Sequence, residues 1–120
     1  MLAAEHRLRS SAEFTQVVRQ GRRAGRPTLT THLLVTSSGE QPRAGLVVSK
    51  AIGGSVVRHR VARRLRHLLR GRVGGLPAGA LLVVRAAPPA AAAASAVLAA
   101  DLDRALARTL ERTLDRAAAR

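Results

Sequence analysis

Cations dominate the stretch from Val56 to Arg72, which reads VVRHRVARRLRHLLRGR and contains no acidic residue. On a helix of 3.6 residues per turn, one side carries five arginines and two histidines: Arg60, Arg63, Arg64, Arg66, Arg70, His59 and His67. Like charges at these spacings repel one another. A run of charge is usually only a solvated face, but the absence of interspersed acids favours a surface that binds a polyanion.

The other side of the same stretch is apolar, so the helix needs a core to cover it. Its apolar positions are Val57, Val61, Leu65, Leu68 and Leu69, with Ala62 at the edge. We expect Ser55 to be the N-cap and the glycines from Gly71 onward, with Pro77, to end the helix. Arg58 lies towards the apolar side, where we expect it to reach past the start of the helix.

Residues for covalent or acid–base catalysis do not form a recognisable group. Glu5 lies at the terminus and Glu40 in a turn, whereas two-metal hydrolysis needs several clustered carboxylates. Residues 50–54 lack the spacing of a P-loop, and the GXXG of residues 71–74 is followed by Gly and Pro rather than by a helix. Cysteine is absent, which excludes disulfides and zinc knuckles. We therefore expect no catalytic residue and no metal site on the protein.

Composition places the polyanion site in the first part of the chain. The 120 residues predict one domain, 1–120, with a net charge of +14 that indicates nucleic acid or an anionic membrane surface. Sixteen of the 21 basic residues but only three of the seven acidic ones precede residue 91. The longest apolar run, 86–100, is mostly alanine broken by two prolines and a serine, which disfavours a membrane span. Charged residues from Glu5 to Arg9 exclude a secretory signal, so we expect a cytoplasmic protein.

The remaining segments predict an α+β chain in the order α, β, β, α, β, α. Ser10 to Glu13 has the form of a capping box, and the helix that it begins ends at Gly21. A basic loop of residues 22–27 follows. Strands are predicted at 28–36, 43–49 and 80–84, the first two as an antiparallel hairpin and the third buried on both faces. An alanine-rich helix is expected over about 90–120, with leucines along one side.

The first strand has two chemically different faces. Leu29, Leu33 and Val35 share an apolar face with Thr31, whereas His32 lies on the other, more polar face. Phe14 is the only aromatic residue of the chain, which disfavours base stacking as the main mode of nucleic-acid binding.

The central region resembles the bacterial ribonuclease P protein subunit. That family carries a GLxVSKKxGNAVxRNRxKRxLR-like signature, and this chain has GLVVSK at 45–50, Ile52-Gly53, and VRHRVARRLR at 57–66. The family's helical Glu-Phe pair and following glycine correspond to Glu13-Phe14 and Gly21. The resemblance covers roughly residues 7–88, and its signature is specific because it joins a strand, a lysine, a glycine turn and spaced arginines.

The resemblance implies an αβββαβα-like domain in which the basic helix makes a left-handed crossover between parallel strands, against the general right-handed rule. It further implies a protein that partners a large catalytic RNA, which removes the 5′ leader of precursor tRNA with Mg²⁺. The protein of this family binds that RNA and the leader, as a monomer in a 1:1 ribonucleoprotein, but does not cleave. Ribonuclease P is an endoribonuclease, so the chain would be the protein subunit of an enzyme whose Mg²⁺ belongs to the RNA.

The resemblance also assigns site residues. RNA-contacting positions are Lys50, Arg58, His59, Arg60, Arg63, Arg64, Arg66 and Arg70, and the leader cleft is lined by Phe14, Val18 and His32. Five of this chain's residues depart from the family pattern. His59 and Gly54 each replace an asparagine, Ala51 replaces a lysine, Val18 replaces an aromatic residue, and His32 replaces an aromatic residue that is more often Tyr or Phe. The imidazole of His59 cannot reproduce the hydrogen-bonding geometry of an amide.

Three other functions stay open at this point. A ribosomal or other structural RNA-binding protein would share the charge but have no role in tRNA processing. A DNA-binding regulator would read the major groove with the basic helix, but it would need a helix-turn-helix partner. An autonomous nuclease is disfavoured by the missing carboxylate or histidine group.

Overall fold

Four strands form one mixed sheet in the computed structural model, which describes residues 4–118 and the side chains of residues 4–115. The strands are β1 (Arg22–Gly25), β2 (Leu29–Val35), β3 (Arg43–Val47) and β4 (Ala80–Ala86), arranged in the order β1-β2-β4-β3. β4 pairs antiparallel with β2 and parallel with β3. This interior place explains the continuous apolar run 80–84, because both faces of β4 are covered, as predicted.

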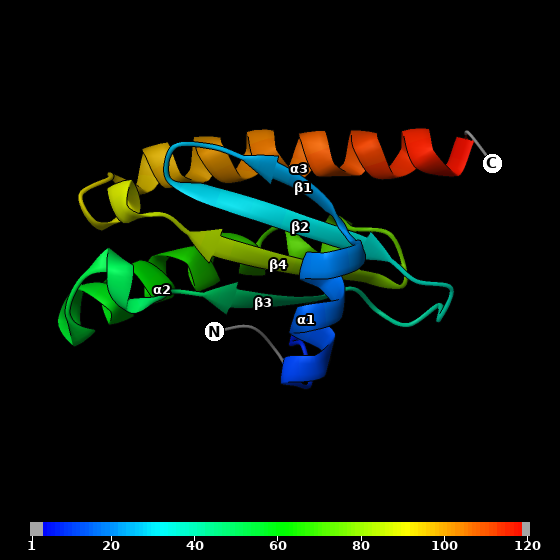
Figure 1. The fold of residues 1–120 in the computed structure, drawn as a ribbon, viewed down its shortest axis with the longest axis horizontal. Coiled ribbons are helices and arrows are strands. Elements are labelled where there is room, and N and C mark those ends of the chain that lie inside the picture. The colour runs from blue at the N-terminus through cyan, green and yellow to red at the C-terminus, as the bar shows by residue number, and fades with distance from the viewer. Residues whose placement is uncertain (1–3, 119–120) are drawn as a thin grey trace.

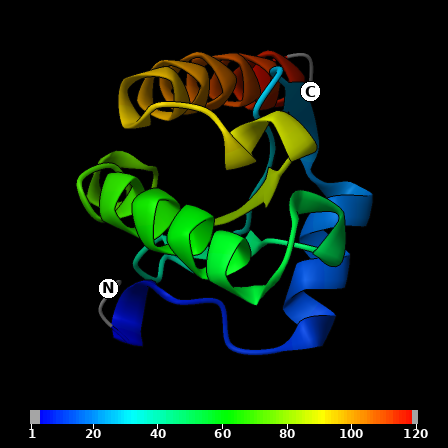
Figure 2. The same ribbon diagram turned by 90° about the vertical axis from the view of Figure 1, so that its left-hand side faces the viewer.

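Three helices cover the two faces of the sheet (Figures 1 and 2). They are α1 (Ser11–Gln20), α2 (Ser55–Arg70) and α3 (Ser95–Ala118), and short 3₁₀ turns join them to the strands at Ala4–His6, Lys50–Ile52, Val73–Gly75 and Pro88–Ala91. α1 lies on one face, and α2 and α3 lie on the other. Since α2 connects the parallel strands β3 and β4 from behind the sheet in Figure 1, the crossover is left-handed. The αβββαβα order implied by the family resemblance is confirmed.

The core has two parts, one on each side of the sheet. The larger part joins the sheet residues Leu33 and Leu82 to Leu65 of α2 and Leu102 of α3. The smaller part lies under α1, where Val17 is fully buried. The predicted faces of β2 are confirmed, because Leu29 and Leu33 belong to the first part and Leu34 packs in the second.

Local signals explain where α1 begins and ends. The hydroxyl oxygen of Ser10 accepts a hydrogen bond from the Glu13 N–H at 3.3 Å, so Ser10 is the N-cap. The Glu13 carboxylate accepts from the N–H of Arg9 at 2.6 Å, one residue earlier than an ordinary capping box. At Gly21, a Cβ atom would approach the carbonyl oxygens of Val17 and Leu33 too closely, so glycine is needed there.

Three sequence predictions are wrong in detail. The strands 28–36 and 43–49 do not form a hairpin, because the doubly apolar β4 lies between β2 and β3 and pairs with both. The basic loop is instead largely the edge strand β1, which forms its own antiparallel pair with β2. The N-cap of α2 is Gly54 rather than Ser55, which is already the first helical residue.

The C-terminal helix begins later than its composition alone indicates. Residues Pro88–Ala91 form a 3₁₀ turn, and α3 starts only at Ser95. Leu98, Leu102 and Leu106 are buried against the sheet, whereas Leu114 is 63% exposed because the last described turns of α3 extend beyond the core.

Candidate nucleic-acid interface

Helix α2 presents an uncompensated cationic face to solvent. Its apolar side is buried in the core through Val61, Ala62, Leu65 and Leu69, as predicted, and this fixes the opposite side outward. The exposed members of the predicted set are Lys50, His59, Arg63, Arg66 and Arg70. His67 lies among them and is exposed as well. Four cations and two imidazoles are therefore exposed along α2 and the turn before it, and we call this surface the α2 ridge.

The other three predicted arginines of this region, Arg58, Arg60 and Arg64, are half-buried, and two of them bind the backbone of another segment. Arg60 Nη2 donates to the carbonyl oxygen of Ala91, and Arg64 Nη1 donates to that of Ala93, both at 3.2 Å. These bonds fasten the segment between β4 and α3 to α2. Among the described side chains, the buried Nε atoms of Arg58 and Arg60 have no hydrogen-bond partner. The predicted RNA-binding set thus contains exposed residues and two residues, Arg60 and Arg64, that position the segment before α3.

The turn before α2 depends on one glycine. Gly53 has a φ of 149°, a conformation that other residues rarely adopt, and a Cβ atom there would lie 3.2 Å from Cβ of Val57. This turn follows the exposed Lys50 and directs the chain from β3 into α2. The glycine of the family-like signature is therefore explained by backbone geometry at Gly53, whereas Gly54 has open space around it.

The three residues assigned to the leader cleft lie on the face of the sheet that α1 covers. Phe14 and Val18 of α1 are half-buried and pack in the smaller core part. His32 is 4% exposed on the same face, directly opposite Val83 of β4. The structure places them on one face, but their contact with a leader stays a prediction.

Sequence reasoning missed two arginines on that face, which we call the α1 face. The register sets Arg23 of β1 opposite His32, and Arg85 of β4 opposite Thr30. Burial, followed by the charges of Arg85 and Arg23, lowers the pKa of His32 below its ordinary value of 6.5. Among the described residues His32 Nδ1 is buried without a partner. Only the strand register brings these residues together, so no local sequence signal identifies Arg23 or Arg85.

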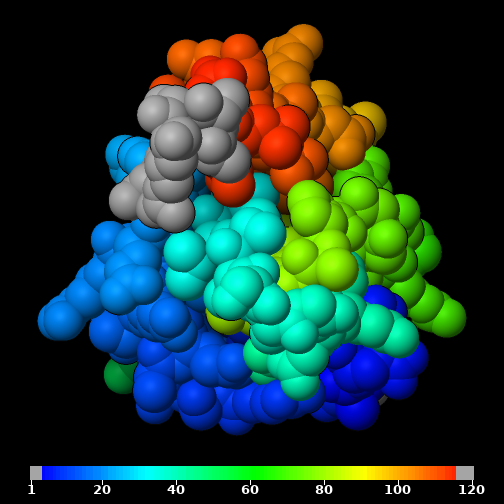
Figure 3. Space-filling view, turned by 90° about the vertical axis from the view of Figure 1, so that its right-hand side faces the viewer, coloured from blue at the N-terminus to red at the C-terminus, as the bar shows by residue number. Residues whose placement is uncertain are grey.

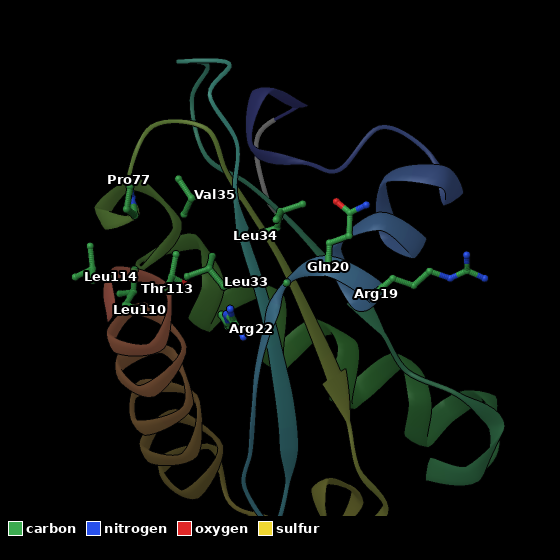
Figure 4. A pocket seen from close by; sticks show the side chains of 11 residues that line it. Arg19, Gln20, Arg22, Leu33, Leu34, Val35, Pro77, Leu110, Thr113 and Leu114 are labelled. Atoms are coloured by element: carbon green, nitrogen blue, oxygen red, sulfur yellow. The ribbon is translucent and has the colours of Figure 1, made fainter. Parts of the chain in front are cut away.

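A hollow of about 710 Å³ lies elsewhere, at the end of the molecule where α1, β2 and α3 meet (Figures 3 and 4). Its lining comes from Arg19 to Arg22, Leu33 to Val35, Pro77 and the last described turns of α3. It contains none of Phe14, Val18 and His32, so it is separate from the predicted cleft.

The described residues contain neither a metal site nor a membrane-spanning helix. Within residues 4–118, no three His, Cys, Asp or Glu side chains come together in a way that could hold a metal ion. In the same residues, no helix has the length and apolar character needed to cross a membrane.

Comparison with known proteins decides the family. A model of the family described as Ribonuclease P matches residues 2–110. The chain belongs to the ribonuclease P protein family. A "Ribonuclease P protein component" from Nocardioides sp. is 56% identical over 108 residues, covering 88% of this chain and 92% of the relative. Another from Streptomyces avermitilis is 54% identical over 114 residues, covering 88% and 93%.

Solved structures of the family share the fold at much lower identity. The ribonuclease P protein of Staphylococcus aureus superposes with a TM-score of 0.76 at 21% identity, covering 84% of this chain and 92% of that one. The protein of Thermotoga maritima gives 0.73 at 21% identity, covering 85% and 96%. The mixed sheet with its left-handed crossover is therefore the fold of this family.

Proposed function

We propose that this chain is the protein component of ribonuclease P and acts as an RNA-binding cofactor in removing the 5′ leader from precursor tRNA. The observation that carries the proposal is the exposed ridge of α2, with its cations on one side and its apolar residues buried on the other. Together with the family relationship, this ridge supports a polyanion partner, namely the catalytic RNA of the enzyme.

Each part of the ridge has a different task in this proposal. Arg63, Arg66 and Arg70 point to solvent and bind phosphates, and Lys50 extends the surface at the start of α2. Arg60 and Arg64 each use one N–H on a backbone carbonyl, which leaves other guanidinium N–H groups free to donate to RNA. His59 is exposed and can donate or accept only through its ring nitrogens, so it replaces an amide imperfectly.

The leader binds on the α1 face, in this proposal, next to Phe14, Val18 and His32. Arg23 and Arg85 add positive charge on either side of His32, and they suit a phosphate backbone. The lowered pKa keeps His32 neutral at pH 7, so it contributes a hydrogen bond rather than a charge. Only one aromatic residue is available, and binding is accordingly more electrostatic than stacked.

Cleavage itself belongs to the RNA partner in this proposal. The described side chains of this protein offer no cluster for two-metal chemistry, and Mg²⁺ would be held by RNA phosphates rather than by a protein site. The protein would work as a monomer in a 1:1 ribonucleoprotein in the cytoplasm.

Reconstitution tests the proposal directly. The purified protein is mixed with a bacterial ribonuclease P RNA and precursor tRNA at low Mg²⁺, and release of the 5′ leader is followed. Cleavage that needs both RNA and protein is the expected result. Cleavage by the protein alone would indicate a nuclease, and tight RNA binding with no gain in cleavage would indicate a structural RNA-binding protein.

A further inference from the structure

A second cationic surface forms where the edge strand β1 meets helix α3. Arg22 and Arg23 belong to β1 and Arg26 directly follows it, whereas Arg104, Arg108 and Arg112 belong to α3, almost eighty residues later. We call the surface formed by Arg23, Arg26, Arg104, Arg108 and Arg112 the β1–α3 edge. The sequence alone gives no sign of it, because the charges of the C-terminal segment are nearly balanced.

Contacts fix these arginines beside one another. Arg112 donates a guanidinium N–H to the backbone carbonyl of Arg23, and Arg26 Nε lies 3.7 Å from a carboxylate oxygen of Asp101. From Asp101, the arginines follow at positions i+3, i+7 and i+11, which lie along one side of a helix. Arg104 and Arg108 therefore lie on the β1 side of α3, between the two contacts.

The acids of α3 neutralise this side only in part. Asp103 faces the opposite flank, where its carboxylate pairs with Arg72 at 2.5 and 3.1 Å. Asp101 is buried and accepts hydrogen bonds from Thr28, and its ion pair with Arg26 offsets the charge of that one arginine. Glu111 lies 3.3 Å from Arg108, but both side chains are more than half exposed, and such a pair contributes little. Asp115, three residues after Arg112, is a further exposed acid on this side. The five arginines of the surface thus outnumber its three acids, Asp101, Glu111 and Asp115.

This edge is continuous with the α1 face. Arg23 belongs to both surfaces. Its side chain lies on the α1 face beside His32, and its backbone carbonyl accepts a hydrogen bond from Arg112. β1 and β2 are neighbouring strands, about 4.8 Å apart. An RNA strand that crosses the α1 face over β4 and β2 reaches β1 next and then the arginines of α3.

We propose that the β1–α3 edge binds the distal part of the leader, as single-stranded RNA that continues from the α1 face around the edge of the sheet. Arg104 and Arg112 are about 12 Å apart along the helix axis, enough to contact successive phosphates. Only a flexible strand can turn around a sheet edge, since a nucleic-acid duplex is stiff over about 150 base pairs. The inference rests on the proposed function and adds to it a dependence on leader length.

The test compares two leaders on the reconstituted ribonucleoprotein. Precursor tRNAs with leaders of about 4 and about 16 nucleotides span the single-strand lengths that a small domain binds. We expect the wild type to bind the longer leader more tightly and R104A/R108A to lose this gain. The salt dependence of the long-leader complex should fall by about 1.4 in slope, at roughly 0.7 per phosphate, while the short-leader slope stays unchanged.

A matched control removes the same charge from the opposite edge of the sheet. R7A/R9A changes two exposed arginines of the segment that pairs with β3, and this variant should keep the length-dependent gain. Equal losses in both variants would overturn the inference, because they would reflect net charge alone. A weaker affinity of R104A/R108A for the catalytic RNA without substrate would also overturn it.

The outcomes separate this inference from the proposed function. If the wild type binds and processes precursor tRNA but R104A/R108A keeps the full gain with leader length, only the inference fails. If the wild type shows no protein-dependent binding of precursor tRNA, both fail. Circular dichroism and thermal unfolding show whether the variants are folded, which we expect because alanine suits exposed helix positions.

Discussion

The ring of Phe14 occupies the space directly above Gly45. A Cβ atom at Gly45 would overlap Cζ of Phe14 and lie 2.9 Å from Cδ1 of Leu8. Phe14, the only aromatic residue of the chain, therefore packs against β3 because Gly45 has no side chain. It serves the core and the α1 face at the same time, because it is only half-buried.

The contact between Phe14 and Gly45 should couple the effects of substitutions at the two positions. Gly45→Ala should lower the free energy of unfolding by about 1–3 kcal/mol, because the added methyl group overpacks the site. In a Phe14→Ala background, the same substitution should cost little, since the ring is gone and alanine suits a strand better than glycine. Urea denaturation of the four proteins measures the coupling. If the two substitutions have additive effects on the free energy of unfolding, Phe14 and Gly45 do not interact.

Phe14 also provides a test of leader binding. Phe14→Ala should reduce the affinity of the ribonucleoprotein for precursor tRNA more than for mature tRNA, provided that unfolding curves show a folded variant. Phe14→Leu, which keeps an apolar side chain, is the matched control and should lose less. Equal losses for the two tRNAs would assign Phe14 to the core alone.

The exposed arginines of α2 should set the salt dependence of RNA binding. R63A/R66A should reduce the slope of log K against log salt by about 1.4–1.8, since each phosphate contributes roughly 0.7–0.9. Unfolding should be unaffected, because both side chains are exposed. R63K/R66K keeps both charges, so its slope should stay at the wild-type value. An unchanged slope in R63A/R66A would show that neither residue contacts the RNA.

Arg64 should behave differently from Arg63, its neighbour in the sequence. Arg64→Ala leaves the carbonyl of Ala93 without its guanidinium donor and should cost about 1 kcal/mol in the free energy of unfolding. Arg63→Ala is the control and should cost less than about 0.5 kcal/mol. Thermal unfolding of the free protein measures both, and equal stabilities would contradict a positioning role for Arg64.

His32 should make stability depend on pH in the range below its ordinary pKa of 6.5. Burial, Arg85 and Arg23 lower its pKa, so below about pH 6.5 the folded protein binds fewer protons than the unfolded chain. The free energy of unfolding should therefore fall on acidification through this range, by at most about 1.4 kcal/mol per pH unit. His32→Gln should flatten this dependence, whereas His67→Gln, at an exposed position, should leave it. An unchanged slope in His32→Gln would show that His32 titrates normally.

The attachment of α3 to the sheet depends on Thr28 and Asp101. The Asp101 carboxylate accepts from the Thr28 hydroxyl at 2.6 Å and from its N–H at 3.2 Å, and these bonds outweigh burial to lower the pKa of Asp101. Thr28→Val should cost about 1.5–3 kcal/mol in the free energy of unfolding, as expected for a hydrogen bond to a charged group. Thr28→Ser keeps the hydroxyl and should stay near the wild type; if valine is tolerated equally well, the bond contributes nothing.

Local patterns in the sequence determined most of the elements. The period of Val61, Leu65 and Leu69 fixed the buried side of α2, and the serine and glutamate before Phe14 fixed the start of α1. These features depend on neighbours within a few residues, which the sequence displays directly. The family signature at 45–66 then identified the partner class, because its residue types and spacing are specific.

Strand partners and converging charges were decided only by the tertiary structure. β4 pairs with β2 on one side and β3 on the other, while α1 covers one of its faces and α2 and α3 cover the other. Nothing local to 28–49 reveals that a strand thirty residues later will separate the predicted hairpin. The edge strand β1 was missed because arginines and glycine are typical of loops, yet pairing with β2 overrides that preference. The register then sets Arg23 beside His32, and α3 brings Arg112 to the same strand. Pairing between distant segments depends on how the whole core packs. Local patterns in the sequence therefore cannot predict which of these residues become neighbours.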